Sequence, residues 1–241
     1  MNSLKYREEF ERLLANYHIS AQAEKILAQL KLVILCGPSA SGRNTIISQL
    51  IQRGGYSFIV SDTTRKPRED NGRLEQNGVN YWFRSEHEML AELKAGDFLE
   101  AEIIHKQQVS GISLRELRRA YDAGLIAITD VDVGGFNNIV LVKPDTLAIL
   151  ILPPSFNEWV RRLYERSELP ESEIRNRMET GSRIFAEAVN NKQAIVIIND
   201  QLGSAVDEVE RLAHGGQPQN SRIAQKLAAQ LLKQTNAYLA G

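Results

Sequence analysis

The segment from position 37 to position 45 has the composition and spacing of a loop that binds phosphate groups. It reads Gly37-Pro38-Ser39-Ala40-Ser41-Gly42-Arg43-Asn44-Thr45, with its two glycines five positions apart. It follows the apolar run 32–35 and precedes a run with helical spacing. In that setting backbone N–H groups and the positive end of a helix can hold phosphates. The alternative is a glycine-rich turn that binds nothing.

Two residues of this segment depart from the P-loop pattern G-x-x-x-x-G-K-[ST]. Arg43 stands where lysine is expected, and Asn44 stands where a hydroxyl would meet Mg²⁺. Arginine keeps the positive charge but is a wide planar fork. The Asn44 carbonyl oxygen is a donor that Mg²⁺ accepts, with a different reach from that of serine. Phosphate binding is therefore expected with altered geometry.

A second cluster of charge begins after residue 61, in the segment Ser-Asp-Thr-Thr-Arg-Lys-Pro-Arg. Arg65, Lys66 and Arg68 place three cations within four residues, although the whole chain carries a formal charge of only −1. Guanidinium groups bind phosphate through paired hydrogen bonds. A phosphate ligand is expected here, and a solvated basic loop is the alternative.

Several short blocks, in this order and spacing, resemble the guanylate kinases, a family of P-loop nucleoside monophosphate kinases. The blocks are Gly37-Pro38-Ser39; Ser61-x-Thr63-Thr64-Arg65-x-x-Arg68; Glu75-x-x-Gly78-x-x-Tyr81-x-Phe83; Phe98-Leu99-Glu100; Asp130-Val131-Asp132; Leu152-Pro153-Pro154-Ser155; and Asn199-Asp200. The resemblance covers roughly residues 31–212. It implies phosphoryl transfer from ATP, with Mg²⁺, to a nucleoside monophosphate, GMP first, by a divergent member with a degenerate phosphate loop.

The resemblance also assigns roles in binding the acceptor nucleotide. Arg65, Arg68 and Tyr81 would hold its phosphate, while Ser61, Glu100 and Asp132 would face its base. A carboxylate can accept hydrogen bonds from the N1–H and N2–H₂ edge of guanine, which adenine lacks. Glu100 is therefore the expected discriminator between the two purines.

For the donor, the resemblance implies that residues 37–45 hold the phosphates of ATP and that Asn199 lies beside the adenine. Arg43 would supply charge at the β- and γ-phosphates, and Asp130 with Asn44 would organise Mg²⁺ or its waters. A lid at about 160–178 would close Arg166 and Arg177, and less surely Arg162, over the transferring group. Arg161, Arg162 and Arg175 are alternatively exposed helix charges.

Departures from the family keep two other functions open. Residues 110–112 read Ser-Gly-Ile, which lacks the phosphate-binding phenol and the base-binding hydroxyl of relatives; Gly134 replaces a glutamine; and residues 70–72 form an insertion. One alternative is a guanylate-kinase-like binding or scaffold module with impaired catalysis. The other is a kinase of a different small phosphorylated acceptor.

The elements that must position these residues alternate between strands and helices. Five aliphatic runs, at 30–35, 56–60, 125–129, 146–152 and 193–198, predict buried parallel strands. Ser-x-x-Glu patterns at Ser85, Ser113 and Ser155 predict helix starts with capping boxes. We expect an α/β, three-layer P-loop kinase fold with a parallel central sheet, an acceptor-binding insert at about 61–112 and a helical lid.

Composition and the ends of the chain complete the expectation. With 29 basic and 30 acidic residues and a single cysteine, a broad nucleic-acid surface and a disulfide framework are disfavoured. No leader or membrane span is recognised, which favours a cytoplasmic location. Residues 1–30 are expected to form a helical extension, residues 31–212 the kinase-like domain, and residues 213–241 a linker and a helix. That helix would pack on the N-terminal helices or, alternatively, on a second subunit in a homodimer.

Overall fold

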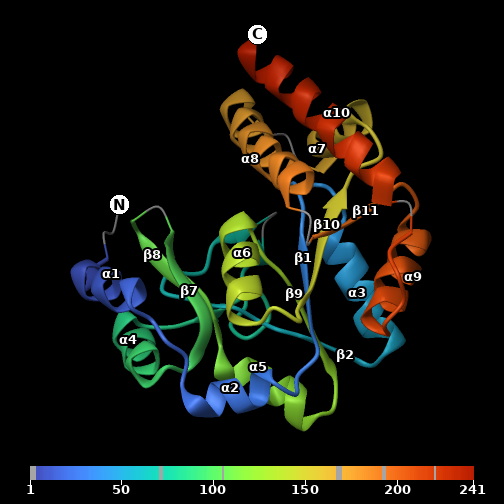
Figure 1. Cartoon of the computed structure of the whole chain (residues 1–241). Helices are drawn as coiled ribbons and strands as arrows, with labels where there is room; N and C mark the ends of the chain where they lie inside the picture. The colour runs from blue at the N-terminus through green and yellow to red at the C-terminus, as the bar shows by residue number, and fades with distance from the viewer. Residues whose placement is uncertain (1–3, 71–72, 105, 167–169, 192–193, 220) are drawn as a thin grey trace. The chain divides into compact units, whose positions relative to one another are not determined.

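The computed structural model describes residues 4–70, 73–104, 106–166, 170–191, 194–219 and 221–241. The chain divides into two compact units. Unit 1 comprises Met1–Lys31, Tyr56–Ala127 and Asn138–Pro144, and unit 2 comprises Leu32–Gly55, Ile128–Asn137 and Asp145–Gly241. The predicted acceptor-binding insert lies within unit 1, and the predicted phosphate loop and lid lie within unit 2 (Figure 1).

Unit 2 is built on a sheet of apolar strands, in the order β11-β10-β1-β9. The strands are β1 (Leu32–Cys36), β9 (Ile126–Asp130, of which unit 2 holds the residues from Ile128), β10 (Leu147–Leu152) and β11 (Ile195–Ile198). β1 and β11 both pair with β10 in parallel. All five residues of β1 are buried, as expected for a strand covered on both faces. The predicted parallel core is confirmed.

Six helices of the described residues surround this sheet. They are α3 (Arg43–Arg53), α6 (Val133–Val142, which starts in unit 2 and ends in unit 1), α7 (Phe156–Arg166), α8 (Glu171–Asn190), α9 (Leu202–Ala213) and α10 (Ser221–Ala240). α3 packs beside α9, and α10 lies along α8 (Figure 1). Because α3, α7 and α9 each follow a strand of this sheet, the loops before them lie at the carboxyl ends of the strands, where loops of parallel sheets bind ligands.

Unit 1 centres on a small sheet in the order β6-β3-β8-β7. Its strands are β3 (Asp62–Thr63), β6 (Trp82–Phe83), β7 (Phe98–Ile104) and β8 (Gln108–Ser113), with a separate pair, β4 (Glu69–Asp70) and β5 (Arg73–Leu74), and the short β2 (Tyr56–Phe58). Its helices are α1 (Arg7–Ala15), α2 (Ala21–Leu27), α4 (Glu86–Ala95) and α5 (Leu114–Asp122). Phe10 of α1 is buried with Met89 of α4 and Phe98 of β7. Helix α1 therefore belongs to this core.

Helix starts agree with the capping patterns to different degrees. Ser85 and Glu88 form the full reciprocal capping box of α4, and the Ser155 hydroxyl accepts from the Glu158 N–H at 3.1 Å. The box expected at Ser113 is wrong, because Ser113 makes no capping bond and Glu116 instead accepts from the Val60 N–H at 3.2 Å. A tertiary backbone donor takes the carboxylate that the local pattern assigned to the helix end.

The C-terminal segment forms the predicted helix, but the expected packing on the N-terminal helices is wrong. Ala224, Ala228, Leu231 and Thr235 are buried, and α10 packs against α8, β11 and α7 of its own unit. A buried apolar stripe predicts that a partner exists and not which helix it is. Among the described residues, no helix has the length and apolar character needed to cross a bilayer.

Candidate nucleotide-binding sites

The phosphate loop between β1 and α3 adopts a tight turn with two residues in the left-handed region. The Ser41 N–H donates to the Pro38 carbonyl at 3.1 Å, Ala40 has φ 63°, and Gly42, which precedes α3, has φ 93°. A non-glycine residue in this region costs free energy, which a packed surrounding must supply. Gly37 is required as well, because an added Cβ would lie 2.5 Å from the Ile151 carbonyl oxygen. The loop thus has the shape expected of a preformed phosphate cradle at a helix N-terminus.

Two buried side chains donate hydrogen bonds to backbone carbonyls of the loop. The Asn199 side chain donates from Nδ2 to the Ser41 carbonyl at 2.8 Å, and the Trp159 indole donates from Nε1 to the Ser39 carbonyl at 2.8 Å. Trp159 is fully buried, and Asn199 is 5% exposed. Asn199 was expected beside the adenine of ATP; the structure places its amide against the loop backbone. Both bonds restrain carbonyls on one side of the loop.

Arg43 forms an ion pair with a carboxylate at the end of β9. Its Nη1 lies 3.2 Å from Asp130 Oδ2 and donates to the Val131 carbonyl at 3.3 Å. The structure therefore brings together two predicted donor-site residues, the cation meant for the phosphates and the acid meant for the metal. Each of the two groups balances the charge of the other.

The other predicted metal ligand, Asn44, is exposed in the first turn of α3, and Thr45 beside it is also exposed. Asp132 accepts the Gly135 N–H at 2.9 Å, which caps the start of α6. Within the described part of the chain, no three His, Cys, Asp or Glu side chains gather as a metal site. Mg²⁺ is commonly bound through one or two carboxylates plus substrate phosphates. The oxygens of Asp130 and Asn44 fit such a shared site.

The predicted anion site in unit 1 is assembled around Arg65. Its guanidinium is paired with Glu75 through both Nη atoms, one of them 2.8 Å from Oε1, and its carbon lies 4.6 Å from the ring centroid of Tyr81 and 5.6 Å from that of Phe83. Arg65 lowers the pKa of the Glu75 carboxyl through these bonds. The Arg65 side chain is only 12% exposed. The fork is thus held in one orientation by a carboxylate and two aromatic rings.

Arg68 adjoins the same group through its backbone. Its N–H donates to Glu75 Oε2 at 2.8 Å, and its carbonyl accepts the Glu75 N–H at 2.9 Å. The side chain of Arg68 is exposed. The structure therefore brings Arg65, Arg68 and Tyr81 together as predicted, and it adds Glu75, which occupies the Arg65 fork as a phosphate would.

Two of the three residues expected to read the base, Ser61 and Glu100, share one face of the small sheet, whereas Asp132 belongs to unit 2. Glu100 pairs across the strands with Ile112, and Ser110 pairs with Thr63. Because antiparallel partners project to the same side, these four side chains share a face, and Ser61, two residues before Thr63, continues it. The Ser110 hydroxyl donates to Thr63 Oγ1 at 2.8 Å, whereas Ile112 offers only a buried aliphatic side chain.

The arginines of the predicted lid helices also rest on acidic partners. Arg162 Nε donates to Glu158 at 2.7 Å and its Nη1 to the Asn199 carbonyl at 3.1 Å, while Arg177 Nε donates to Glu173 at 3.0 Å. Bonds from Arg161 and Arg162 lower the pKa of Glu158 to about 2. Arg166 ends α7, and its side chain lies outside the described residues. Arg161 is an exposed helix charge, the alternative considered for it.

The opposite face of the small sheet carries a charge network that the motifs did not reveal. Asp62 is fully buried and accepts from Arg84 at 3.0 Å and from Arg115 at 2.9 Å. Arg84 also donates to Glu92 at 2.5 Å. Desolvation raises the pKa of Asp62 despite these cations. The network ties β3 to α4 and α5, and so supports the strand that follows Ser61.

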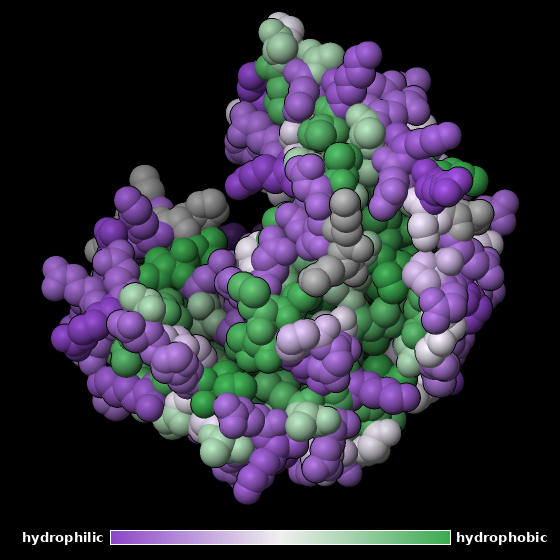
Figure 2. Space-filling view, viewed as in Figure 1, coloured by the Kyte–Doolittle hydropathy of each residue, from purple (hydrophilic) through white to green (hydrophobic). Residues whose placement is uncertain are grey.

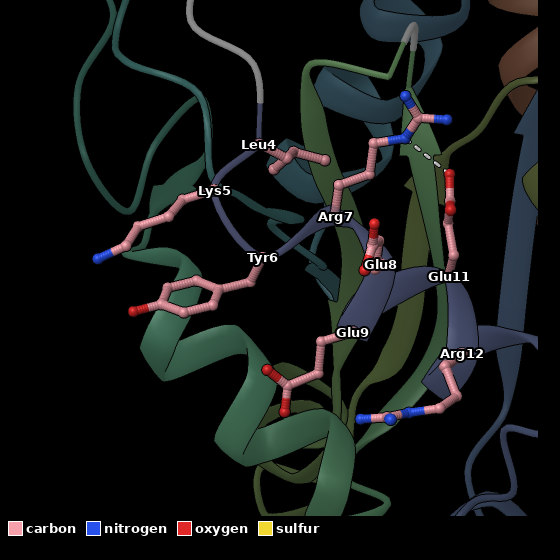
Figure 3. Close-up of a pocket in the computed structure, with 8 residues that line it drawn as sticks. All are labelled: Leu4, Lys5, Tyr6, Arg7, Glu8, Glu9, Glu11 and Arg12. Atoms are coloured by element: carbon pink, nitrogen blue, oxygen red, sulfur yellow. Dashed lines mark hydrogen bonds and ion pairs between the residues drawn. The ribbon is translucent and has the colours of Figure 1, made fainter.

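A large open pocket in unit 1 lies apart from all of these residues. It has a volume of about 750 Å³ and is lined by the stretch from Leu4 to Arg12 (Figure 3). Charged side chains of both signs surround it, including the Arg7–Glu11 ion pair at 2.7 Å, and hydrophilic residues cover much of this part of the surface in Figure 2. None of the predicted site residues lines it, so this pocket is not part of the predicted nucleotide sites.

Comparison with known proteins accounts for the order of the motifs. A sequence model of the family described as "Guanylate kinase" matches residues 29–214. Guanylate kinase of Corynebacterium diphtheriae is 33% identical over 187 residues, which is 77% of this chain and 95% of that protein. Guanylate kinase of a Synechococcus species is 32% identical over 78% of this chain and 84% of its own length. The crystal structure of guanylate kinase from Anaplasma phagocytophilum matches with a TM-score of 0.57 and 21% identity over 80% of this chain and 89% of that chain. By these matches, the chain belongs to the guanylate kinase family.

Proposed function

We propose that this protein transfers the terminal phosphoryl group of ATP to GMP, giving ADP and GDP. The observation that carries the proposal is the family match over residues 29–214. Two features support it: the Arg65 guanidinium lies over the Tyr81 ring, in an orientation suited to binding a phosphate, and a preformed loop precedes α3. Phosphoryl transfer needs mainly positioning and cationic stabilisation, and both units supply groups of the right kind.

Each unit has its own part of the work. In unit 2, backbone N–H groups of the loop and the N-terminus of α3 hold the donor phosphates, and Arg43 leaves Asp130 to neutralise charge on them. In unit 1, Arg65 exchanges Glu75 for the acceptor phosphate. Glu100 accepts from the donor edge of guanine.

The lid arginines and the metal complete the arrangement. Arg162 and Arg177 turn from Glu158 and Glu173 towards the equatorial oxygens of the transferring group, and Arg166 joins them there. Mg²⁺, held by Asp130 and Asn44 together with ATP, would supply neutralisation of charge on the donor phosphates. Separation of Arg43 from Asp130 would thus free the guanidinium for the donor phosphates and the carboxylate for Mg²⁺.

A coupled ADP-release assay with ATP and Mg²⁺ tests the proposal. GMP, dGMP, AMP, UMP and CMP are supplied in turn, each with a control lacking the acceptor. ADP release that depends on GMP, at a higher kcat/KM than for the other nucleotides, is the expected result. Binding of GMP without turnover would indicate a binding module, and turnover only with another nucleotide would indicate a different acceptor.

A further inference from the structure

The helix α10 lies beyond the family match, which ends at residue 214, yet it packs directly on the predicted lid helices. It runs along α8 and also touches α7 (Figure 1). The Ser182 hydroxyl of α8 donates to Asn236 at 2.6 Å, and Arg175 Nη2 donates to the Leu239 carbonyl at 2.7 Å. The second bond satisfies a carbonyl at the C-terminal end of α10, where a cation is electrostatically favoured.

Tyr238, near the end of α10, touches both of these helices. Its phenol donates to Glu171 Oε1 at the start of α8 at 3.1 Å, and its ring centroid lies 6.1 Å from that of Phe156 at the start of α7. Hydrogen bonding with Tyr164 of α7, together with burial and the Glu171 bond, raises the pKa of Tyr238 to about 12. The phenol is therefore neutral at physiological pH and can bridge the two helices.

From α7 the contacts continue to the phosphate loop. Trp159 packs edge to face on Phe185 of α8 with ring centroids 5.1 Å apart, and an added Cβ on Gly181 would lie 2.3 Å from its ring. The same indole donates to the Ser39 carbonyl. Packed side chains of this kind transmit a displacement because interiors have little free volume.

We propose that α10 is a positioning element of the donor site, in which Tyr238 holds α7 against α8 and thereby fixes Arg162 and Arg177 relative to the phosphate loop. The inference rests on the proposed function for its catalytic consequence. Reacting groups displaced by about 1 Å can lose a large part of the rate, so the spacing of the two arginine-bearing helices matters directly. A chain without α10 would need another contact to fix the spacing of α7 and α8.

The test replaces Tyr238 by phenylalanine, which keeps the ring and removes the hydroxyl. The matched control is Tyr121→Phe, which removes a phenol in unit 1 that donates to Gln29 at 2.6 Å. For Tyr238→Phe we expect kcat with ATP and GMP to fall about three- to tenfold while KM for GMP changes less than twofold. Amide hydrogen exchange in the first turns of α8 should quicken by a similar factor, with α3 unchanged. The control should show neither effect.

The outcomes separate this inference from the proposed function. If the natural protein releases no ADP with any nucleotide, the proposed function fails, and exchange in α8 still decides whether Tyr238 holds the helices together. Unchanged exchange in Tyr238→Phe would overturn the inference, as would faster exchange with unchanged kcat in an active enzyme. An equal response to Tyr121→Phe would also overturn it.

Discussion

Replacement of Arg65 by alanine tests the acceptor site at its best-defined residue. The change removes a fork that binds Glu75 through two nitrogens, stacks on Tyr81 and is 12% exposed. Truncating one partner of a buried, hydrogen-bonded charge pair costs about 2–5 kcal/mol, and the partial exposure of Arg65 places it near the lower end. At about 1.4 kcal/mol per factor of ten, 2–3 kcal/mol corresponds to a 30- to 150-fold weaker Kd for GMP.

Calorimetric titration of GMP and of ATP, each alone, measures both affinities. ATP affinity should change less than twofold, since its predicted phosphate loop lies in unit 2. Part of the loss comes from Glu75, which keeps an unpaired carboxylate where the phosphate must bind. Glu75→Gln added to Arg65→Ala should therefore recover about three- to tenfold of GMP affinity. Arg7→Ala, which breaks only an exposed helix pair, is the control. Equal weakening of ATP and GMP by Arg65→Ala would refute the two-site assignment.

Four further substitutions test the donor loop, the recognition of the base and the packing behind the site. Arg43→Ala should lower kcat by about 10²-fold in the coupled assay, as does loss of one preorganised contact to the transition state, and an unchanged rate would reject its role. GMP should be preferred to AMP in kcat/KM, with Ile112→Thr widening the preference and Glu100→Gln narrowing it; an AMP preference would mean that the base is read elsewhere. Gly181→Ala puts a Cβ 2.3 Å from Trp159, so overpacking of about 1–3 kcal/mol, partly offset by better helix propensity, should lower the Tm by about 3–6 °C. An equal or higher Tm would contradict that contact.

The strands formed by the aliphatic runs were predictable because the apolar pattern that marks them is local in the sequence. A run such as residues 146–152 is apolar at nearly every position, and only burial on both faces accounts for that pattern. The shape of the phosphate loop was predictable for a related reason. Gly37 leaves no room for a Cβ, and Gly42 has a positive φ that glycine adopts most readily. Ser85 and Glu88 cap α4 as their spacing indicates, because both partners lie in the same turn.

The side chains that contact the phosphate loop from other elements were not predictable, because they are distant from it in the sequence. Trp159 meets the loop 120 positions away, and nothing around it distinguishes this indole from an ordinary core residue. Glu116 was wrongly assigned for the same reason. Its local pattern predicted a capping box, but its carboxylate accepts a hydrogen bond from the distant Val60 N–H instead. Glu75 lay within a recognised motif, and a carboxylate seven residues after Arg68 was a usable signal for a pair with Arg65.

One arrangement recurs at four of the described arginines of the predicted sites. Arg43, Arg65, Arg162 and Arg177 rest on Asp130, Glu75, Glu158 and Glu173, respectively. On the proposed roles, an entering phosphate would exchange one oxyanion for another, so that pairing with a carboxylate already offsets the desolvation cost of each guanidinium. The gain on binding is the difference between two similar interactions, and it is correspondingly small for any single contact. Tight binding then requires several exchanges at once, which only a correctly placed nucleotide provides. The carboxylates thus favour selectivity over raw affinity, because an isolated phosphate replaces one partner while a nucleotide replaces several.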